Sequence, residues 1–204
     1  TDLQTGPLVR EHALCLGLAA AQVGSAQIRN IGTVGGNIAN GSPIGDMPPM
    51  LIALDATLHL RHDSEVRSLP LESFFIAYGK QDRKPGELVW RIDVPKLAAD
   101  QVFRAYKISK RFDQDISAVC AAFAFTFDGD MVASARIAFG GMAATPKRAA
   151  AAEAALAGKR WDEASVATAM AAMAEDYNPL SDMRASGEYR MKAAQNLLRR
   201  FWFE

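Results

Sequence analysis

The chain has 204 residues and 50% hydrophobic content, which is enough for one large domain or two small ones with real cores. Lys and Arg together number 23, as do Asp and Glu, so the net charge is zero. A neutral chain gives no overall electrostatic reason to expect nucleic acid or an anionic membrane as a partner. The two cysteines, Cys15 and Cys120, follow no metal or disulfide spacing, and charges or glycines break the apolar runs well short of a membrane span. Because no signal-peptide pattern opens the chain, we expect a soluble, cytoplasmic protein.

The chain opens directly on a predicted helix. Thr1 or Thr5 can cap this helix, and the apolar residues that follow are Leu8, Val9, Leu14, Leu16, Leu18 and Ala19. No initiator methionine precedes it. We therefore expect that an N-terminal portion of the protein lies before Thr1.

A glycine-rich segment follows, and its residues 27–46 read QIRNIGTVGGNIANGSPIGD. The glycine spacing matches neither the dinucleotide-binding G-x-G-x-x-G pattern nor a P-loop. One interpretation is a chain that turns tightly at Gly35 and Gly36, with asparagines that tolerate left-handed conformations. The other is a ligand loop, in which the glycines let backbone N–H groups approach an anion or a ring edge. In that case Asp46 supplies one carboxylate, which suits ribose or ribityl hydroxyls.

The rest of the first half alternates short elements. Residues 47–54 predict a helix with Pro48 and Pro49 in its first turn. Residues 56–62 predict an amphipathic strand with His59 on the face opposite to Leu58 and Leu60. A second strand and a helical turn follow within 64–75, then a polar loop at 77–87 and a strand at 87–95. His59 and His62 point to opposite faces, so we expect no shared metal site, and nothing in the sequence brings a Ser-His-Asp triad together.

The second half predicts a sheet and helices. After a linker at 96–101, residues 102–109 and 116–127 predict strands separated by a charged loop. The second strand is bulky on one face and small on the other, which suits a sheet covered on both sides, with helices on the bulky side. Asp128-Gly129 predicts a hairpin to a partner strand at 131–142.

Three helices complete the predicted chain. The first begins at Thr145-Pro146, with threonine as the cap, and the others run from about 162 to 176 and from about 187 to 203. The whole is an α+β chain in two pieces, roughly 1–95 and 100–204.

The stretch 106–116, YKISKRFDQDI, is the other candidate site. A loop with three cations and two acids is usually just solvated. Alternatively, Lys107 leaves the end of a strand and points toward an electron-rich ligand. A cation there stabilises a developing anion, as on a reduced flavin ring.

Four stretches together resemble the FAD-binding part of xanthine dehydrogenases, most closely the small subunit of the bacterial two-subunit enzymes. They are QIRNIGTVGGNIANGSPIGD, FFIAYGKQDRKPGE, YKISKRFDQDIS and SDMRASGEYRMKAAQNLLRRFW. They occur in the right order, and the resemblance extends over essentially the whole chain. Flavoprotein subunits of carbon monoxide dehydrogenase and aldehyde oxidoreductases share the pattern I-R-N-x-G-T-x-G-G-N. The second stretch favours xanthine dehydrogenase.

The resemblance implies a fold and a function. Residues 1–95 are expected to form the second lobe of a vanillyl-alcohol-oxidase/PCMH-type FAD-binding domain. Residues 100–204 are expected to form a C-terminal α+β domain of the CO dehydrogenase flavoprotein type, with an antiparallel sheet and helices. In the intact oxidoreductase, FAD passes electrons from iron–sulfur clusters to NAD during hypoxanthine and xanthine oxidation, and a molybdopterin subunit completes the enzyme. The alternatives are the flavoprotein subunit of another molybdenum hydroxylase, oxidising CO or an aldehyde, and a non-catalytic scaffold fragment that does not retain FAD.

The resemblance also implies roles for single residues, none of them catalytic and none a metal ligand. The residues that would line the FAD phosphates and ribityl chain are Gly32, Thr33, Gly36, Asn37 and Ala39. Asp46 would bind ribityl hydroxyls, Leu88 and Val89 would pack near the isoalloxazine ring, and Lys107 would lie beside that ring. The loop 110–115 would border the approach of NAD.

Two departures from the resemblance matter. Relatives carry an earlier lobe whose glycine-bearing loop wraps the FAD pyrophosphate, and some place an aromatic residue where Val23 stands. The sequence also holds no iron–sulfur cysteines, so those clusters belong to another domain or chain. We expect this fragment alone to be inactive.

Overall fold

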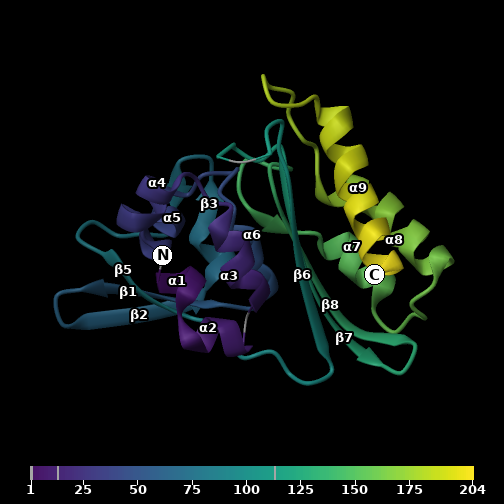
Figure 1. The fold of residues 1–204 in the computed structure, drawn as a ribbon, viewed down its shortest axis with the longest axis horizontal. Helices are drawn as coiled ribbons and strands as arrows, with labels where there is room; N and C mark the ends of the chain where they lie inside the picture. Colours follow the sequence, from purple (N-terminus) through teal and green to yellow (C-terminus); the bar gives the residue numbers. More distant parts are fainter. Residues whose placement is uncertain (1, 13, 113) are drawn as a thin grey trace.

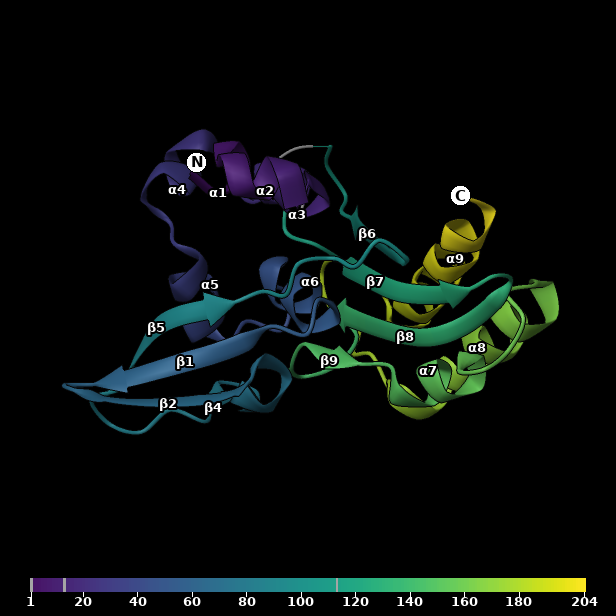
Figure 2. The same ribbon diagram turned by 90° about the horizontal axis from the view of Figure 1, so that it is seen from below.

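The computed structural model describes residues 2–12, 14–112 and 114–204 and shows an α+β chain built in two parts (Figure 1). The elements of the first part are α1 (Asp2–Thr5), α2 (Pro7–His12), α3 (Leu14–Ala21), α4 (Ala26–Ile31), α5 (Val34–Asn40), α6 (Met47–Ala53), β1 (Thr57–His62), β2 (Glu65–Pro70), the 3-10 turn η1 (Leu71–Phe74), β3 (Phe75–Ala77), β4 (Lys80–Gln81) and β5 (Leu88–Asp93). β1 pairs antiparallel with both β2 and β5, while β3 and β4 form a short hairpin. Figure 2 shows α1–α4 on one side and this sheet on the other, with α5 and α6 between them.

The second part is an antiparallel sheet with helices. Its elements are β6 (Gln101–Ile108), β7 (Val119–Asp128), β8 (Met131–Gly140), β9 (Lys147–Arg148), α7 (Ala150–Leu156), α8 (Glu163–Asp176) and α9 (Gly187–Phe203). The strands lie in the order β6-β7-β8-β9, and the turn at Gly129 joins β7 to β8 as predicted. Side chains of Asp162 and Ser186 cap α8 and α9, so both helices begin where the sequence predicts. The predicted α+β class is confirmed.

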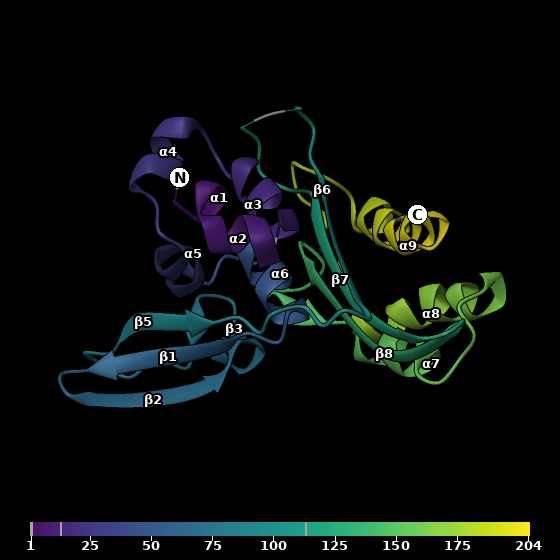
Figure 3. The same cartoon turned by 60° about the horizontal axis from the view of Figure 1, so that its bottom comes forward.

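Strand β7 carries two hydrophobic cores, one on each face. Its bulky residues, such as Phe123 and Phe125, lie in a core with α7, α8 and α9. Its small residues, such as Cys120 and Ala122, lie in a second core with α6. Figure 3 shows α6 on one side of the sheet and α7–α9 on the other. The predicted two-sided cover is therefore confirmed, with the helices of the second part on the bulky face.

Most of the glycine-rich segment is helical, and only residues 32–33 and 41–46 lie outside helices. It contains α4 and α5, separated by Gly32 and Thr33. The Thr33 hydroxyl accepts a hydrogen bond from the Gly36 N–H at 2.9 Å and so caps α5. Gly41 ends α5 in the left-handed conformation, at φ +61°, which glycine adopts without steric cost. The predicted turn at Gly35 and Gly36 was wrong, because both glycines lie inside α5.

Two further predictions need correction. The opening helix is divided, because α2 starts anew with Pro7 as its first residue; Thr1 lies outside the described residues. The helix predicted from Thr145-Pro146 begins later, at Ala150, because β9 first pairs with the end of β8. The free N–H groups of Ala151 and Ala152 donate to the Asp176 carboxylate at 2.9 and 3.1 Å, so the cap comes from another helix.

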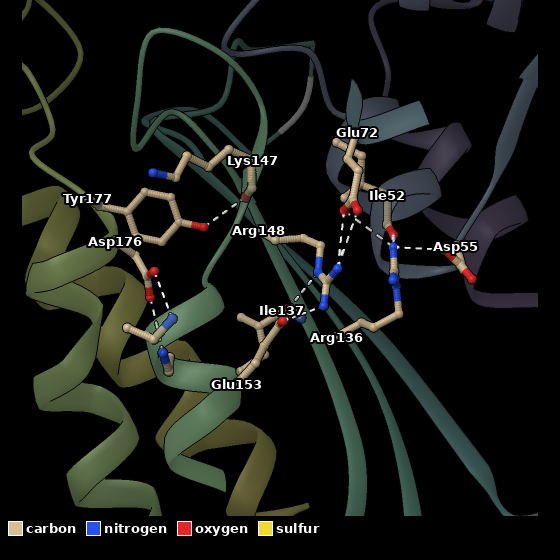
Figure 4. A network of polar contacts seen from close by, with 12 residues as sticks. Ile52, Asp55, Glu72, Arg136, Ile137, Lys147, Arg148, Glu153, Asp176 and Tyr177 are labelled. Carbon is tan, nitrogen blue, oxygen red and sulfur yellow. Dashed lines mark hydrogen bonds and ion pairs between the residues drawn. The ribbon is translucent and has the colours of Figure 1, made fainter. Parts of the chain in front are cut away.

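Arginines of the second part hold the first part in place (Figure 4). Arg136 on β8 donates to the Ile52 carbonyl at the end of α6 at 2.8 Å and pairs with Asp55 at 3.0 Å. Arg148 on β9 lies between Glu72 and Glu153, with ion-pair distances of 3.3 and 2.5 Å. All residues of α6 are buried, so this helix fixes how the two parts meet. No helix in the described ranges is long and apolar enough to cross a membrane.

Candidate functional site

Two cavities lie on either side of α3. The first has a volume of about 430 Å³, and its lining residues include Gln22, Asp46, Tyr106, Lys107 and Arg200. The second has a volume of about 400 Å³, and its lining residues include Val23, Gly32, Thr33, Gly36 and Asn37. Neighbouring residues of α3 face different cavities, since Ala19 lines the first and Ala20 the second.

A buried polar cluster forms one wall of the first cavity, and its centre is Asp46. This residue stands at the cap position of α6, but its side chain does not cap the helix. A capping side chain accepts from the second or third N–H of a helix, and here those residues are Pro48 and Pro49, which have none. The carboxylate bonds to the second part of the chain instead: Ser117 donates to Oδ1, and Lys107 Nζ lies 2.6 Å from Oδ2.

Lys107 completes this cluster from the edge strand β6. Its side chain is about as buried as that of Asp46, with 11% and 9% of the two side chains exposed. The ammonium also donates to the Gln22 carbonyl at 3.2 Å, just beyond the end of α3. The sequence places Asp46 and Lys107 in separate candidate sites, and the structure joins them in one ion pair. Such a pair offers a neighbouring ligand both a hydrogen-bond acceptor and a cation.

The predicted glycine wall lines the second cavity. A Cβ built on Gly36 would lie 3.0 Å from the Thr33 hydroxyl, so glycine at this position leaves room for the hydrogen bond by which Thr33 caps α5. Gly35 has a different role, because a Cβ on it would meet Val89 of β5 at 3.4 Å. The Asn37 amide oxygen is buried and has no hydrogen-bond partner among the residues that the structure describes. An orphaned buried acceptor is costly unless a ligand donates to it.

Leu88, Val89 and Ala39 line neither of the two cavities. Leu88 is 53% exposed on β5, and Val89 lines a separate apolar cavity beside Gly35. Ala39 lies on α5, next to the fully buried Ile38. Asp113, within the loop predicted to border NAD, lies outside the described residues.

Three residues of the site were missed by the sequence reasoning. Ser117 is fully buried, and Cys120 lies beneath the cluster with its thiol 3.7 Å from the Asp46 carbonyl. Burial, and then the Asp46 charge, raise the pKa of the Cys120 thiol well above its usual value, so the group is an un-ionised thiol at neutral pH. Gln22 contributes only a backbone carbonyl, which no side-chain pattern reveals.

A second polar cluster lies on the sheet of the first part. His59 is 8% exposed, and its ring nitrogens lie 2.7 Å from Ser68 Oγ and 2.9 Å from Asp93 Oδ2. The fold therefore brings together a serine, a histidine and an aspartate that the sequence alone gave no reason to join. Neither cavity described above is lined by them. In the described part of the chain, no three His, Cys, Asp or Glu side chains gather as metal ligands.

These groups fit a ligand of the FAD type. The orphaned Asn37 acceptor in the second cavity suits the hydroxyls of a polyol, which can donate to it. The Asp46–Lys107 pair in the adjoining cavity suits hydroxyls together with a group that gains negative charge. Nothing in the fit requires a protein nucleophile.

Two family models match the chain. The model described as the FAD binding domain in molybdopterin dehydrogenase matches residues 1–97, and the CO dehydrogenase flavoprotein C-terminal domain matches residues 104–204.

The relatives and solved structures agree with these matches. Nicotinate hydroxylase hnxS of Emericella nidulans is 40% identical over 183 residues, which are 86% of this chain and 14% of that protein. The glyceraldehyde dehydrogenase medium chain of Sulfolobus acidocaldarius is 33% identical over 196 residues, which are 96% of this chain and 69% of that one. A solved structure of carbon monoxide dehydrogenase from Hydrogenophaga pseudoflava superposes with a TM-score of 0.92 at 32% identity, over 98% of this chain and 69% of that chain. The chain thus spans about a seventh of the fungal relative and about two thirds of the two others.

Proposed function

We propose that this chain, which belongs to the flavoprotein family of the molybdenum hydroxylases, forms one wall of the FAD site in such an enzyme. The observation that carries the proposal is the ion pair between Asp46 and Lys107, at 2.6 Å, in the wall of a cavity. The two residues come from the two parts of the chain, so folding of both parts creates the site. The glycine-lined second cavity lies directly across α3 and extends the same wall.

We assign a binding role to each predicted residue of this wall. Gly32, Thr33, Gly36 and Asn37 line the second cavity and are assigned to the phosphates and the ribityl chain. Ala39 lies outside that cavity, and its place beside the same groups rests on the family resemblance alone. When bound, FAD supplies the ring that takes up electrons and passes a hydride to NAD.

The remaining residues act around the ring. Asp46 accepts hydrogen bonds from ribityl hydroxyls, and Lys107 stabilises negative charge on the ring by its ammonium. Leu88 and Val89 line neither of the two cavities, so their proposed apolar contact with the ring rests on the family resemblance alone, as does the proposed place of the loop 110–115 beside the approach of NAD.

For the whole enzyme we propose a xanthine dehydrogenase. The stretch FFIAYGKQDRKPGE supports this choice. An iron–sulfur domain and a molybdopterin subunit are then the partners, electrons run from the clusters through FAD to NAD, and the enzyme is cytoplasmic.

A second candidate is a hydroxylase of another nitrogen heterocycle. It is supported by the 40% identity to a nicotinate hydroxylase.

Reduction of the assembled enzyme separates the candidates. Xanthine, nicotinate, an aldehyde or CO is added without air, and bleaching of the flavin absorbance is recorded. Bleaching by xanthine alone is expected, and bleaching by nicotinate but not xanthine contradicts the first choice.

Binding of FAD by this chain is tested directly. The purified chain is mixed with FAD and desalted, and the retained yellow absorbance is measured. We expect retained flavin, and its displacement by excess ADP, which shares the phosphate and adenosine portion. A colourless chain contradicts the proposal and favours the alternative of a non-catalytic scaffold that does not retain FAD.

A further inference from the structure

Ser117 is a buried hydroxyl placed against the Asp46 carboxylate. Its residue is fully buried, and its Oγ donates a hydrogen bond to Oδ1 of Asp46. It stands just before β7, where the Ala118 N–H donates to the Ile108 carbonyl at 2.7 Å and closes the charged loop between β6 and β7. The hydroxyl thus faces the site from the end of that loop.

The two oxygens of Asp46 have different partners. Oδ1 accepts from Ser117, and Oδ2 accepts from Lys107 at 2.6 Å. A carboxylate held at both oxygens cannot rotate freely, so its plane is fixed. The two prolines of α6 leave Asp46 no competing N–H to cap, which makes Ser117 the group that holds Oδ1 among the described contacts.

The orientation of Asp46 in turn fixes Lys107. The ammonium has three N–H donors, and in the described part of the chain Asp46 and the Gln22 carbonyl accept two of them. One donor therefore remains for a ligand in the 430 Å³ cavity that Asp46 and Lys107 line. Its direction depends on where Oδ2 lies, and hence on Ser117.

Ser117 is itself attached to a rigid part of the molecule. The neighbouring Ala118 carbonyl accepts from Arg190, whose guanidinium also donates to the Gly141 carbonyl at 3.0 Å. Arg190 is 2% exposed and pairs with Asp182 at 2.7 Å. The serine position is therefore set by α9 and the end of β8 rather than by the exposed loop.

We propose that Ser117 is a positioning residue of the site: it fixes the Asp46 carboxylate so that Asp46 and Lys107 present an acceptor and a donor side by side to a polyol-bearing anionic ligand. This inference rests on the proposed FAD function for the identity of the ligand. The serine acts through Asp46 and makes no contact of its own with the ligand.

The first test is FAD binding by Ser117→Ala, measured by fluorescence titration. Loss of a hydrogen bond to a buried charge predicts a dissociation constant raised about tenfold. Ser117→Thr keeps the hydroxyl and is expected to restore most of the affinity. Ser109→Ala is the matched control, because the Ser109 hydroxyl bonds the Arg111 carbonyl at the other end of the same loop. Equal affinity of Ser117→Ala and wild type, with both folded by circular dichroism, overturns the proposal.

The second test needs no FAD. Lysine acylation by an N-hydroxysuccinimide ester is followed at Lys107 by mass spectrometry in the chain alone. Because Ser117 acts on Lys107 through Asp46, Ser117→Ala is expected to raise the labelling rate of Lys107 at least about threefold, with Lys192 on the surface of α9 as the internal standard. An unchanged rate at Lys107 contradicts the positioning role. If the wild-type chain binds no FAD, the proposed function fails for this chain, while the labelling rate still decides whether Ser117 positions Lys107.

Discussion

Asp46 stands directly before Met47, Pro48 and Pro49, and this order of residues determines what its carboxylate bonds. Prolines are favourable in the first turn of a helix, but they remove the N–H groups that a capping aspartate uses. The released carboxylate would be a buried, unpaired charge without Lys107 and Ser117. The sequence alone therefore shows that Asp46 cannot cap α6, even before its hydrogen-bond partners are known.

Glu87 is a buried carboxyl whose lowered pKa makes stability depend on pH. Hydrogen bonds from Arg67, at 2.6 and 2.9 Å, are the main cause that lowers its pKa from 4.5 to about 2, and the Lys84 N–H assists. A carboxyl whose pKa is lower in the folded state stabilises the fold above the unfolded value, and that contribution is lost as pH falls. We expect the free energy of unfolding to fall by about 1–2 kcal/mol between about pH 5 and about pH 2 from this group.

Urea unfolding at several pH values measures this effect. Glu87→Gln cannot ionise, so its stability should depend less on pH across the same window than that of the wild type. Other carboxyls, such as Asp182, also titrate in acid, and the difference between the two proteins isolates Glu87. Parallel curves for the two proteins would show that the Arg67–Glu87 pair does not stabilise the fold.

At the scale of elements, the periodic patterns of strands and helices predicted β7 and α9 correctly, but the glycines of the segment 27–46 did not predict its helices. β7 alternates large and small residues and α9 carries a cap and a long amphipathic pattern, and both were predicted. The segment 27–46 reads locally as turns, because glycine and asparagine favour them. Its helices form because Thr33 caps α5 and Val89 packs against Gly35, contacts that depend partly on a strand more than fifty residues away.

The start of helix α7 also depends on a distant residue that the local sequence does not reveal. The sequence offers Thr145-Pro146 as a local cap, but β9 uses the following residues, and Asp176 of α8 caps the helix instead. We expect Asp176→Ala to lower the free energy of unfolding by about 1 kcal/mol, because two N–H groups lose their acceptor. Asp176→Asn keeps one acceptor oxygen and should lose less. Chemical denaturation compares the three proteins, and an alanine variant as stable as the wild type would contradict this cap.

At the scale of the whole molecule, α6 joins the two parts and carries the site. The second part contacts it at both ends, through Ser117 and Lys107 at Asp46 and through Arg136 at Ile52. We propose that the boundary between the two domains lies in residues 96–99. The sequence indicated Asp46 and Lys107 one at a time, but Ser117 lies 71 positions from Asp46, and no local pattern links residues so far apart. The site therefore forms only when the two parts of the chain pack together.

The most direct test of the account is the flavin reduction potential of the assembled enzyme with Lys107→Met, beside a Lys192→Met control on the surface of α9. A cation near the ring favours the reduced, negatively charged flavin, so its removal should make the potential more negative by about 30 mV or more, a tenfold change for a two-electron couple. The control should match the wild type. An unchanged potential in Lys107→Met, with flavin still bound, would contradict the claim that this chain places its Asp46–Lys107 pair beside the flavin.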